Sequence, residues 1–183
     1  MKTILQVEDD PNDVFFLQHA MKKAGLANPI QVASDGQEAI DYLQGAGKFA
    51  DREQFPFPSL VLLDLKLPHV MGLDVLKWIR QQSGMTLVVL ILTASGEDAD
   101  IEAAYRLGAN GFLVKPSEAT KLQDMVKAIM EFWLTHNLLP QVFSRATGPR
   151  PPMNANESRP RPGRAAEAAR QVTWLEWTSG GGN

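Results

Sequence analysis

Short apolar runs alternate along the chain with stretches in which apolar residues recur at helical spacing. The runs consist almost entirely of leucine, valine and isoleucine, which is typical of strands buried on both faces of a parallel sheet. Strands are therefore predicted at 3–7, 30–33, 59–64, 86–93 and 111–114, and helices at 12–25, 36–45, 72–83, 97–108 and 117–137. Because strand and helix alternate, we expect right-handed crossovers and an α/β fold with helices on both faces of one sheet.

Polar residues stand at the points where four of the predicted strands end. Glu8 and Asp9 follow the first strand, Asp64 closes the third, Thr93 closes the fourth and Lys115 follows the fifth. The carboxyl ends of parallel strands form the ligand crevice of such a sheet, so these side chains should converge. Three carboxylates held together repel one another unless a cation is present, and Mg²⁺ suits one or two carboxylates, waters and a phosphate oxygen. The pattern predicts a site for a divalent cation and a phosphoryl group.

Several of these residues also have an ordinary structural interpretation, which the sequence leaves open. Asp9 or Asp10, just before a proline, suits the N-cap of a helix, and Thr93 suits the end of any strand. Lys115 is harder to explain in this way, because a lysine beside a buried strand needs a carboxylate or a phosphoryl group as its charge partner. We also hypothesise that the peptide bond between Lys115 and Pro116 is cis and fixes this loop.

The same residues, in the same order, resemble the receiver domain of two-component response regulators over about residues 1–140. The matching segments are Val7-Glu8-Asp9-Asp10, Leu63-Asp64-Leu65-Lys66-Leu67-Pro68 with Gly72, Leu92-Thr93-Ala94 and Lys115-Pro116. The resemblance implies a flavodoxin-like, doubly wound sheet of five parallel strands in the order 2-1-3-4-5 with five helices. One departure is that residues 68–72 lack the acid that often precedes this glycine, which affects the loop and not the metal site.

The resemblance also implies which residues take part in phosphoryl transfer. Asp64 would be the phosphoacceptor, which takes a phosphoryl group from the phosphohistidine of a sensor histidine kinase. Mg²⁺ or Mn²⁺ would be held directly by Asp9 and Asp64, through water by Glu8, and by the backbone carbonyl of Lys66. This assigns to the protein mainly the positioning and electrostatic stabilisation of a loose phosphoryl group.

Other residues are expected to respond to the transferred group. Lys115 would neutralise the phosphoryl charge, and the hydroxyl of Thr93 would bind it. Phe112 occupies the family's switch aromatic position, although burial in the core would also account for a phenylalanine there. Lys66 and Ser95, each two residues after a site residue, overlook the site and would tune the rate of hydrolysis.

The resulting hypothesis is a single-domain response regulator that signals through contact with a downstream protein. It is not expected to be an enzyme beyond its own phosphorylation and dephosphorylation. Two alternatives are an interaction scaffold with a silent site and a Mg²⁺-dependent phosphatase of the haloacid-dehalogenase type. That phosphatase family places Asp-x-Asp after its first strand, whereas Asp9 and Asp10 are adjacent here. A weaker resemblance, carried by residues 22–58 and the approach to Asp64, is to stand-alone receivers that partner phytochrome-like kinases.

Composition narrows the class of protein further. The chain of 183 residues has no cysteine, which excludes disulfides and thiolate chemistry. Residues 1–143 carry a net charge of −6, so direct binding of nucleic acid by this part is not expected. No apolar stretch is long enough to span a membrane, and acids follow the N-terminus too soon for a signal peptide. A cytoplasmic location is therefore expected.

The end of the chain differs in character from the rest. We interpret residues 1–140 as the receiver domain and residues 141–183, rich in proline, glycine and arginine, as a disordered tail with a short helical pattern near 165–177. In the last predicted helix of the domain, Phe132 and Trp133 cannot both face the core. An exposed ring there would support a homodimer, and simple exposure at a helix end is the alternative.

Overall fold

The computed structural model describes residues 2–82 and 85–138 of the chain. The predicted disordered tail of residues 141–183, with its helical pattern near 165–177, lies outside the described residues, as does the predicted domain boundary at residue 140.

Five parallel strands form one sheet in the order β2-β1-β3-β4-β5. The strands are β1 (Ile4–Val7), β2 (Ile30–Ala33), β3 (Leu60–Leu63), β4 (Val88–Thr93) and β5 (Gly111–Val114). Each neighbouring pair is parallel, as in the pairing of Val7 with Leu63 and of Thr93 with Val114. The predicted strand order and the flavodoxin-like fold class are therefore confirmed.

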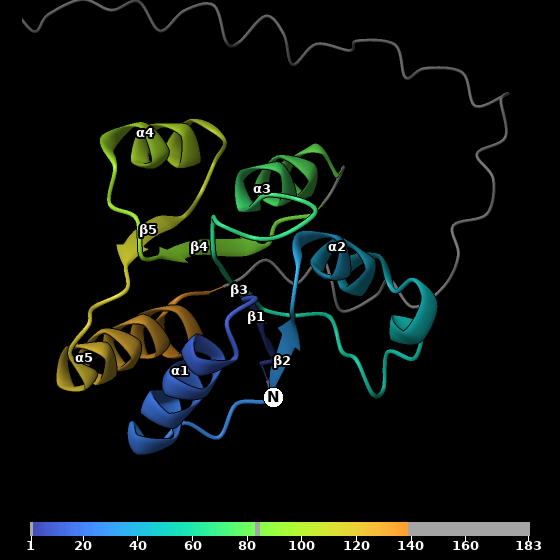
Figure 1. The fold of residues 1–183 in the computed structure, drawn as a ribbon. Helices are drawn as coiled ribbons and strands as arrows, with labels where there is room; N and C mark the ends of the chain where they lie inside the picture. The colour runs from blue at the N-terminus through green and yellow to red at the C-terminus, as the bar shows by residue number, and fades with distance from the viewer. Residues whose placement is uncertain (1, 83–84, 139–183) are drawn as a thin grey trace, which may run out of the picture. The chain divides into compact units, whose positions relative to one another are not determined.

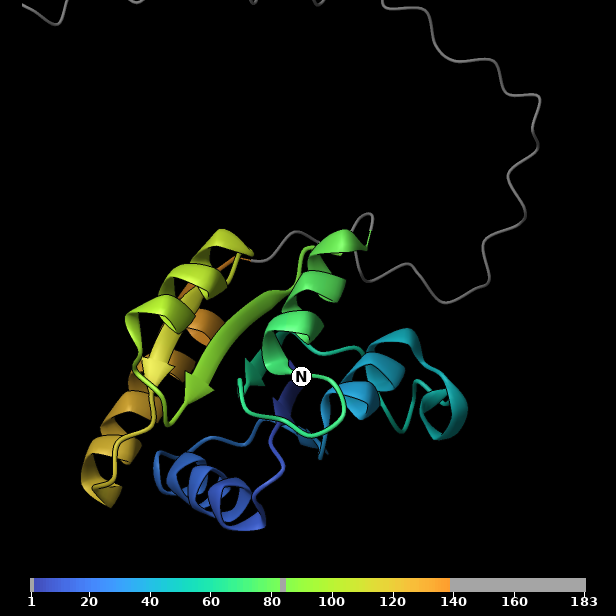
Figure 2. The same ribbon diagram turned by 45° about the horizontal axis from the view of Figure 1, so that its top comes forward.

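Helices cover both faces of the sheet, as Figures 1 and 2 show. One face is covered by α1 (Pro11–Lys23) and α5 (Ala119–Met130), and the other by α2 (Gly36–Gln44), α3 (Gly72–Gln81) and α4 (Asp98–Arg106). Two separate apolar clusters result, one on each side of the sheet. No helix among residues 2–82 and 85–138 has both the length and the apolar character to cross a membrane.

Alternation along the strands explains why the predicted runs are apolar throughout. Successive side chains of a strand point to opposite faces. In β1, Ile4 packs against α1 and α5, whereas Leu5 and Val7 pack into the cluster under α2, α3 and α4. Helices cover both faces of β1, so both sets of alternate positions are apolar. The exception is Gln6, which is buried on the α1/α5 face.

The start of α1 and the end of the last helix answer two questions that the sequence left open. Asp10 caps α1, because its carboxylate accepts a hydrogen bond of 2.8 Å from the backbone N–H of Asn12. The helix predicted at 117–137 is divided into α5 and a π-helical segment, η2 (Glu131–His136). Phe132 in η2 is exposed, whereas Trp133 packs against the α1/α5 cluster, so the two rings do not share the core, as expected.

The long connection between α2 and β3 packs against the apolar cluster under α2, α3 and α4. It contains one turn of 3₁₀ helix, η1 (Gly47–Phe49). The rings of Tyr42, Phe49 and Phe55 meet edge to face, with centroids 5.1 to 6.2 Å apart. Arg52 donates hydrogen bonds to the carbonyls of Tyr42 and Leu43 at the end of α2, which anchors the connection to the helix. The loop that supports the phytochrome-type resemblance is therefore a packed element.

Candidate functional site

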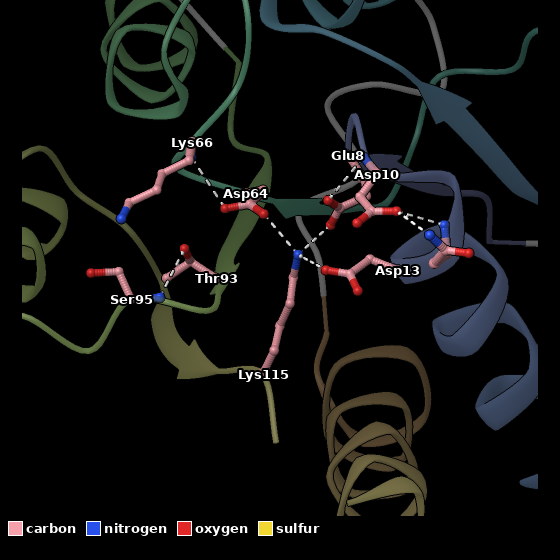
Figure 3. A network of polar contacts seen from close by, with 9 residues as sticks. Glu8, Asp10, Asp13, Asp64, Lys66, Thr93, Ser95 and Lys115 are labelled. Atoms are coloured by element: carbon pink, nitrogen blue, oxygen red, sulfur yellow. Dashed lines mark hydrogen bonds and ion pairs between the residues drawn. The ribbon is translucent and has the colours of Figure 1, made fainter. Parts of the chain in front are cut away.

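Four of the residues predicted at the strand ends lie together at the carboxyl edge of the sheet, namely Glu8, Asp64, Thr93 and Lys115 (Figure 3). Val7 pairs with Leu63, so Glu8 and Asp64, the next residue on each strand, are neighbours across the sheet. On the other side, Thr93 pairs with Val114, which places Lys115 just beyond the end of β5. The parallel register thus brings residues more than 100 positions apart in the sequence into one site.

The ammonium group of Lys115 is the centre of this site. Its Nζ donates hydrogen bonds to Glu8 Oε2 at 2.5 Å, to Asp13 Oδ2 at 2.7 Å and to Asp64 Oδ2 at 2.7 Å. Only 14% of the lysine side chain is exposed. All three hydrogens of the ammonium are engaged. The predicted need of Lys115 for a carboxylate partner is confirmed.

The surroundings of Glu8 and Lys115 shift the pKa of each. Burial raises the pKa of Glu8 to about 7, against the opposing effect of its hydrogen bond with Lys115. Burial alone would lower the pKa of Lys115, but its bonds with the three carboxylates raise that pKa above its ordinary value. The lysine is therefore the fixed counter-charge of the site, and the carboxylates around it outnumber it.

Asp13 is the site residue that sequence reasoning missed. It lies in the first turn of α1, five residues after Glu8, and is an acid of that turn. Its position in the sequence could have indicated this role, because the first turn of a helix that directly follows a strand lies at the carboxyl edge of the sheet. An acid there is also an ordinary feature of helix N-termini, so the pattern did not distinguish it.

The Asp64 carboxylate is held through both oxygens. Oδ2 accepts from Lys115, and Oδ1 accepts from the backbone N–H of Lys66 at 3.2 Å. The Lys66 side chain itself is exposed and extends away from Lys115. Asp9 is exposed as well, and its side chain has no polar partner among residues 2–82 and 85–138. Asp9 thus lies beside the site with its carboxylate free.

Thr93 and Ser95 form a second hydrogen-bonded pair at the end of β4. The Thr93 hydroxyl is buried and accepts a hydrogen bond of 3.4 Å from the backbone N–H of Ser95. The Ser95 hydroxyl donates in turn to Asp100 in the first turn of α4, at 3.1 Å. Phe112 is partly buried and packs against the cluster under α2, α3 and α4. Its packing agrees with both interpretations of this ring.

The loop after β5 is positioned by the sheet. No cis peptide bond occurs in the part of the chain that the structure describes, so the hypothesis of a cis bond before Pro116 is wrong. The backbone N–H of Lys115 donates to the carbonyl of Thr93 at 2.7 Å. The β4–β5 pairing therefore continues up to Lys115. This fixes the backbone of the lysine so that its side chain extends across the ends of the strands.

Replacing Lys115 with methionine should destabilise the metal-free protein. Methionine keeps similar bulk but leaves Glu8, Asp13 and Asp64 without a counter-charge. Breaking a buried ion pair from one side costs about 3–5 kcal/mol. Because Lys115 and Asp13 are partly exposed, we expect the free energy of unfolding in urea with EDTA to fall by the lower end of that range. Lys77→Met, at an exposed position in α3, is the control and should change it little. Equal stability of Lys115→Met and the wild type would contradict the assigned counter-charge.

The fold and this edge of acids, threonine and lysine define the class of the protein. Residues 4–127 match the family model of the response regulator receiver domain. The chain belongs to this family, as its motifs indicated.

Among the similar proteins are response regulators of phytochrome and red-light signaling. The chain is 36% identical to the response regulator Rcp1 of Synechocystis sp. over 140 residues, which cover 76% of this chain and 93% of Rcp1. The structure of RPA3017, a response regulator in red light signaling of R. palustris, superposes with a TM-score of 0.73 at 33% identity and covers 76% of this chain and 99% of that one. For the phosphorylated cyanobacterial phytochrome response regulator RcpA, the TM-score is 0.70 at 34% identity, with coverage of 76% and 98%. The resemblance to phytochrome-type response regulators is therefore confirmed.

Proposed function

We propose that this response regulator accepts a phosphoryl group on Asp64 from the phosphohistidine of a sensor histidine kinase. The observation that carries this proposal is the set of contacts around Asp64. Its two carboxylate oxygens are held by the Lys115 ammonium and the Lys66 N–H, 2.7 and 3.2 Å away. A carboxylate held in this way is oriented as a nucleophile, and the adjacent ammonium offers charge to an incoming phosphoryl group.

The reaction needs few groups from the protein. An oxygen of Asp64 forms a bond to phosphorus as the phosphorus–nitrogen bond of the phosphohistidine breaks, and the imidazole leaves with that electron pair. The transition state is loose, so catalysis depends on alignment and on neutralising the phosphoryl oxygens. Lys115 supplies a positive charge, because its hydrogen bonds with three carboxylates raise its pKa and keep the ammonium group protonated. The side chain of Asp64 is only 9% exposed, which limits the access of water to it.

The donor set at this edge fits a hard divalent cation. The described residues hold no group of three acidic or histidine side chains arranged around one metal position. Mg²⁺ does not need such a group, because it uses one or two carboxylates, carbonyls and waters. Asp9 and Asp64 would bind Mg²⁺ or Mn²⁺ directly, with Glu8 acting through water and the Lys66 carbonyl completing the protein ligands. The bound cation would neutralise charge on the phosphoryl oxygens. A structure of the relative Rcp1 is a Mn²⁺-bound form.

The signal would pass from the phosphoryl group to the surface through Thr93. To bind a phosphoryl oxygen, its hydroxyl turns toward Asp64 and gives up the hydrogen bond from the Ser95 N–H. Ser95 is bonded to α4, so this change reaches the helix, and space vacated by the threonine lets Phe112 turn inward. The output would be a contact with a downstream protein. Lys66 and Ser95 would tune the lifetime of the phosphorylated state.

The relatives support a phytochrome-like kinase as the phosphoryl donor. RcpA is a phytochrome response regulator, and RPA3017 takes part in red light signaling. A homodimer through the exposed ring of Phe132 stays a prediction.

Incubation with radiolabelled acetyl phosphate and Mg²⁺ should label the protein up to about one phosphoryl group per chain, and EDTA should abolish labelling. The reason is that the Asp64 carboxylate is held by the Lys66 N–H directly beside the Lys115 ammonium, which offers charge to the incoming phosphoryl group. Labelling is measured on gels and by intact mass. Continuous turnover of a phosphate ester without a labelled chain would favour the phosphatase alternative. A folded but unlabelled chain would favour the silent scaffold. Transfer from a phosphorylated phytochrome-like kinase, compared with an unrelated histidine kinase, tests the partner.

A further inference from the structure

The contacts of Asp13 give it a role in the phosphorylation equilibrium. We propose that Asp13 is a positioning residue that holds Lys115 in the unphosphorylated protein and must release it when the phosphoryl group arrives, so that it opposes phosphorylation. The inference rests on the proposed phosphoacceptor function of Asp64. It concerns a carboxylate outside the set that the family motifs assign.

The number of donors on Lys115 makes such a release necessary. An ammonium group has three N–H donors, and here all three are used, by Glu8, Asp13 and Asp64. A phosphoryl oxygen that binds Lys115 must take the place of one of these carboxylates. The free energy of phosphorylation therefore includes the cost of breaking one charge-assisted hydrogen bond.

Burial decides which carboxylate is released. The side chains of Glu8 and Asp64 are 5% and 9% exposed, whereas that of Asp13 is 40% exposed. Bulk water can replace the ammonium at the partly exposed Asp13 carboxylate at low cost, whereas the loss of the ammonium at the buried Glu8 costs more. Asp64 is bonded to phosphorus through one oxygen only, so its other oxygen can still accept a hydrogen bond from the lysine. Asp13 is therefore the partner that gives way.

The surroundings of Asp13 suit a carboxylate that changes partners. It lies in the first turn of α1, where the helix dipole stabilises a negative charge that has lost its counter-ion. It also borders a cavity of about 350 Å³ between α1 and α5, which is lined by Lys115 and Ser117 as well. The released side chain has room and solvent on this side.

The test is the binding of beryllofluoride, a phosphoryl mimic, and labelling by acetyl phosphate, both at fixed saturating Mg²⁺. In Asp13→Asn, the half-saturating concentration of each should fall by about two- to fivefold, the change expected from one partly exposed ion pair. Asp13→Glu restores a carboxylate and should stay near the wild type. Thermal unfolding of each variant shows that it is folded.

Two controls distinguish the effect of the Asp13–Lys115 ion pair from effects of net charge or of the structure of α1. Asp10→Asn removes the same charge from the same end of α1 and keeps a good N-cap, and it should leave both concentrations unchanged. In a Lys115→Met background, which binds more weakly, Asp13→Asn should bring no further gain. A purely structural role of Asp13 would not disappear with the lysine.

The outcomes distinguish the two proposals. Unchanged or weaker binding in Asp13→Asn, with normal labelling of the wild type, overturns the role of Asp13 and leaves the phosphoacceptor in place. An equal gain in Asp10→Asn overturns it as well, because net charge would then explain the effect. A folded wild type that is not labelled overturns the proposed function itself.

Discussion

Asp64→Asn is expected to reduce labelling by acetyl phosphate, and transfer from a phosphorylated kinase, to background. Asparagine has nearly the same size and can still accept the hydrogen bond from the Lys66 N–H. Its amide lacks the charged, nucleophilic oxygen, so no phosphoryl bond forms. The measurement is the incorporation of radiolabel after electrophoresis, together with intact mass.

Stability separates this loss from unfolding. The exchange removes one of the carboxylates that surround a single ammonium, so the metal-free variant should unfold within about 1 kcal/mol of the wild type or be slightly more stable. Asp74→Asn, an exposed acid in the first turn of α3, is the matched control and should be labelled normally. Robust labelling of Asp64→Asn would mean that another acid is the phosphoacceptor.

Gly72→Ala is expected to damage both the fold and the phosphoacceptor. A Cβ at this position would lie 2.0 Å from the backbone oxygen of Asp64 and 2.8 Å from the Cα of Leu65. Both are backbone atoms, so no side-chain rotation relieves the contact, and the loop after β3 must shift. Overpacking of this kind costs about 2–4 kcal/mol, which urea unfolding would report. The rate of labelling should fall with it, because the displaced backbone carries Asp64.

Gly96→Ala is the matched control for that substitution. Its Cβ would meet only a methyl group of Val114, at 3.2 Å, and this side chain can move. We expect a change in unfolding free energy within about 1 kcal/mol. Wild-type stability and labelling in Gly72→Ala would show that the loop after β3 tolerates movement, and that Asp64 does not depend on the close approach of α3.

Much of the fold was predictable because burial on both faces leaves a strong sequence pattern. The central strands β1, β3 and β4 are buried along their whole length, and their residues are apolar except for Gln6 and Thr93. The predicted strands match them to within a few residues. The last helix was less predictable. Its apolar spacing runs on to about residue 137, but the backbone changes to π-helical hydrogen bonding at Glu131, which side-chain periodicity does not reveal.

The amino-acid sequence by itself determined which chemistry stands at the strand ends. Parallel strands must end at one edge, so Glu8, Asp64, Thr93 and Lys115 were bound to meet there. Only the tertiary structure decided how they pair. It joined Lys115 to Asp13 across 102 positions, left Asp9 exposed, and turned the Thr93 hydroxyl toward the Ser95 N–H. Such contacts depend on the register of β5 and on the direction in which α1 leaves the sheet. Neither is written in a local pattern, because both result from packing between segments far apart in the chain.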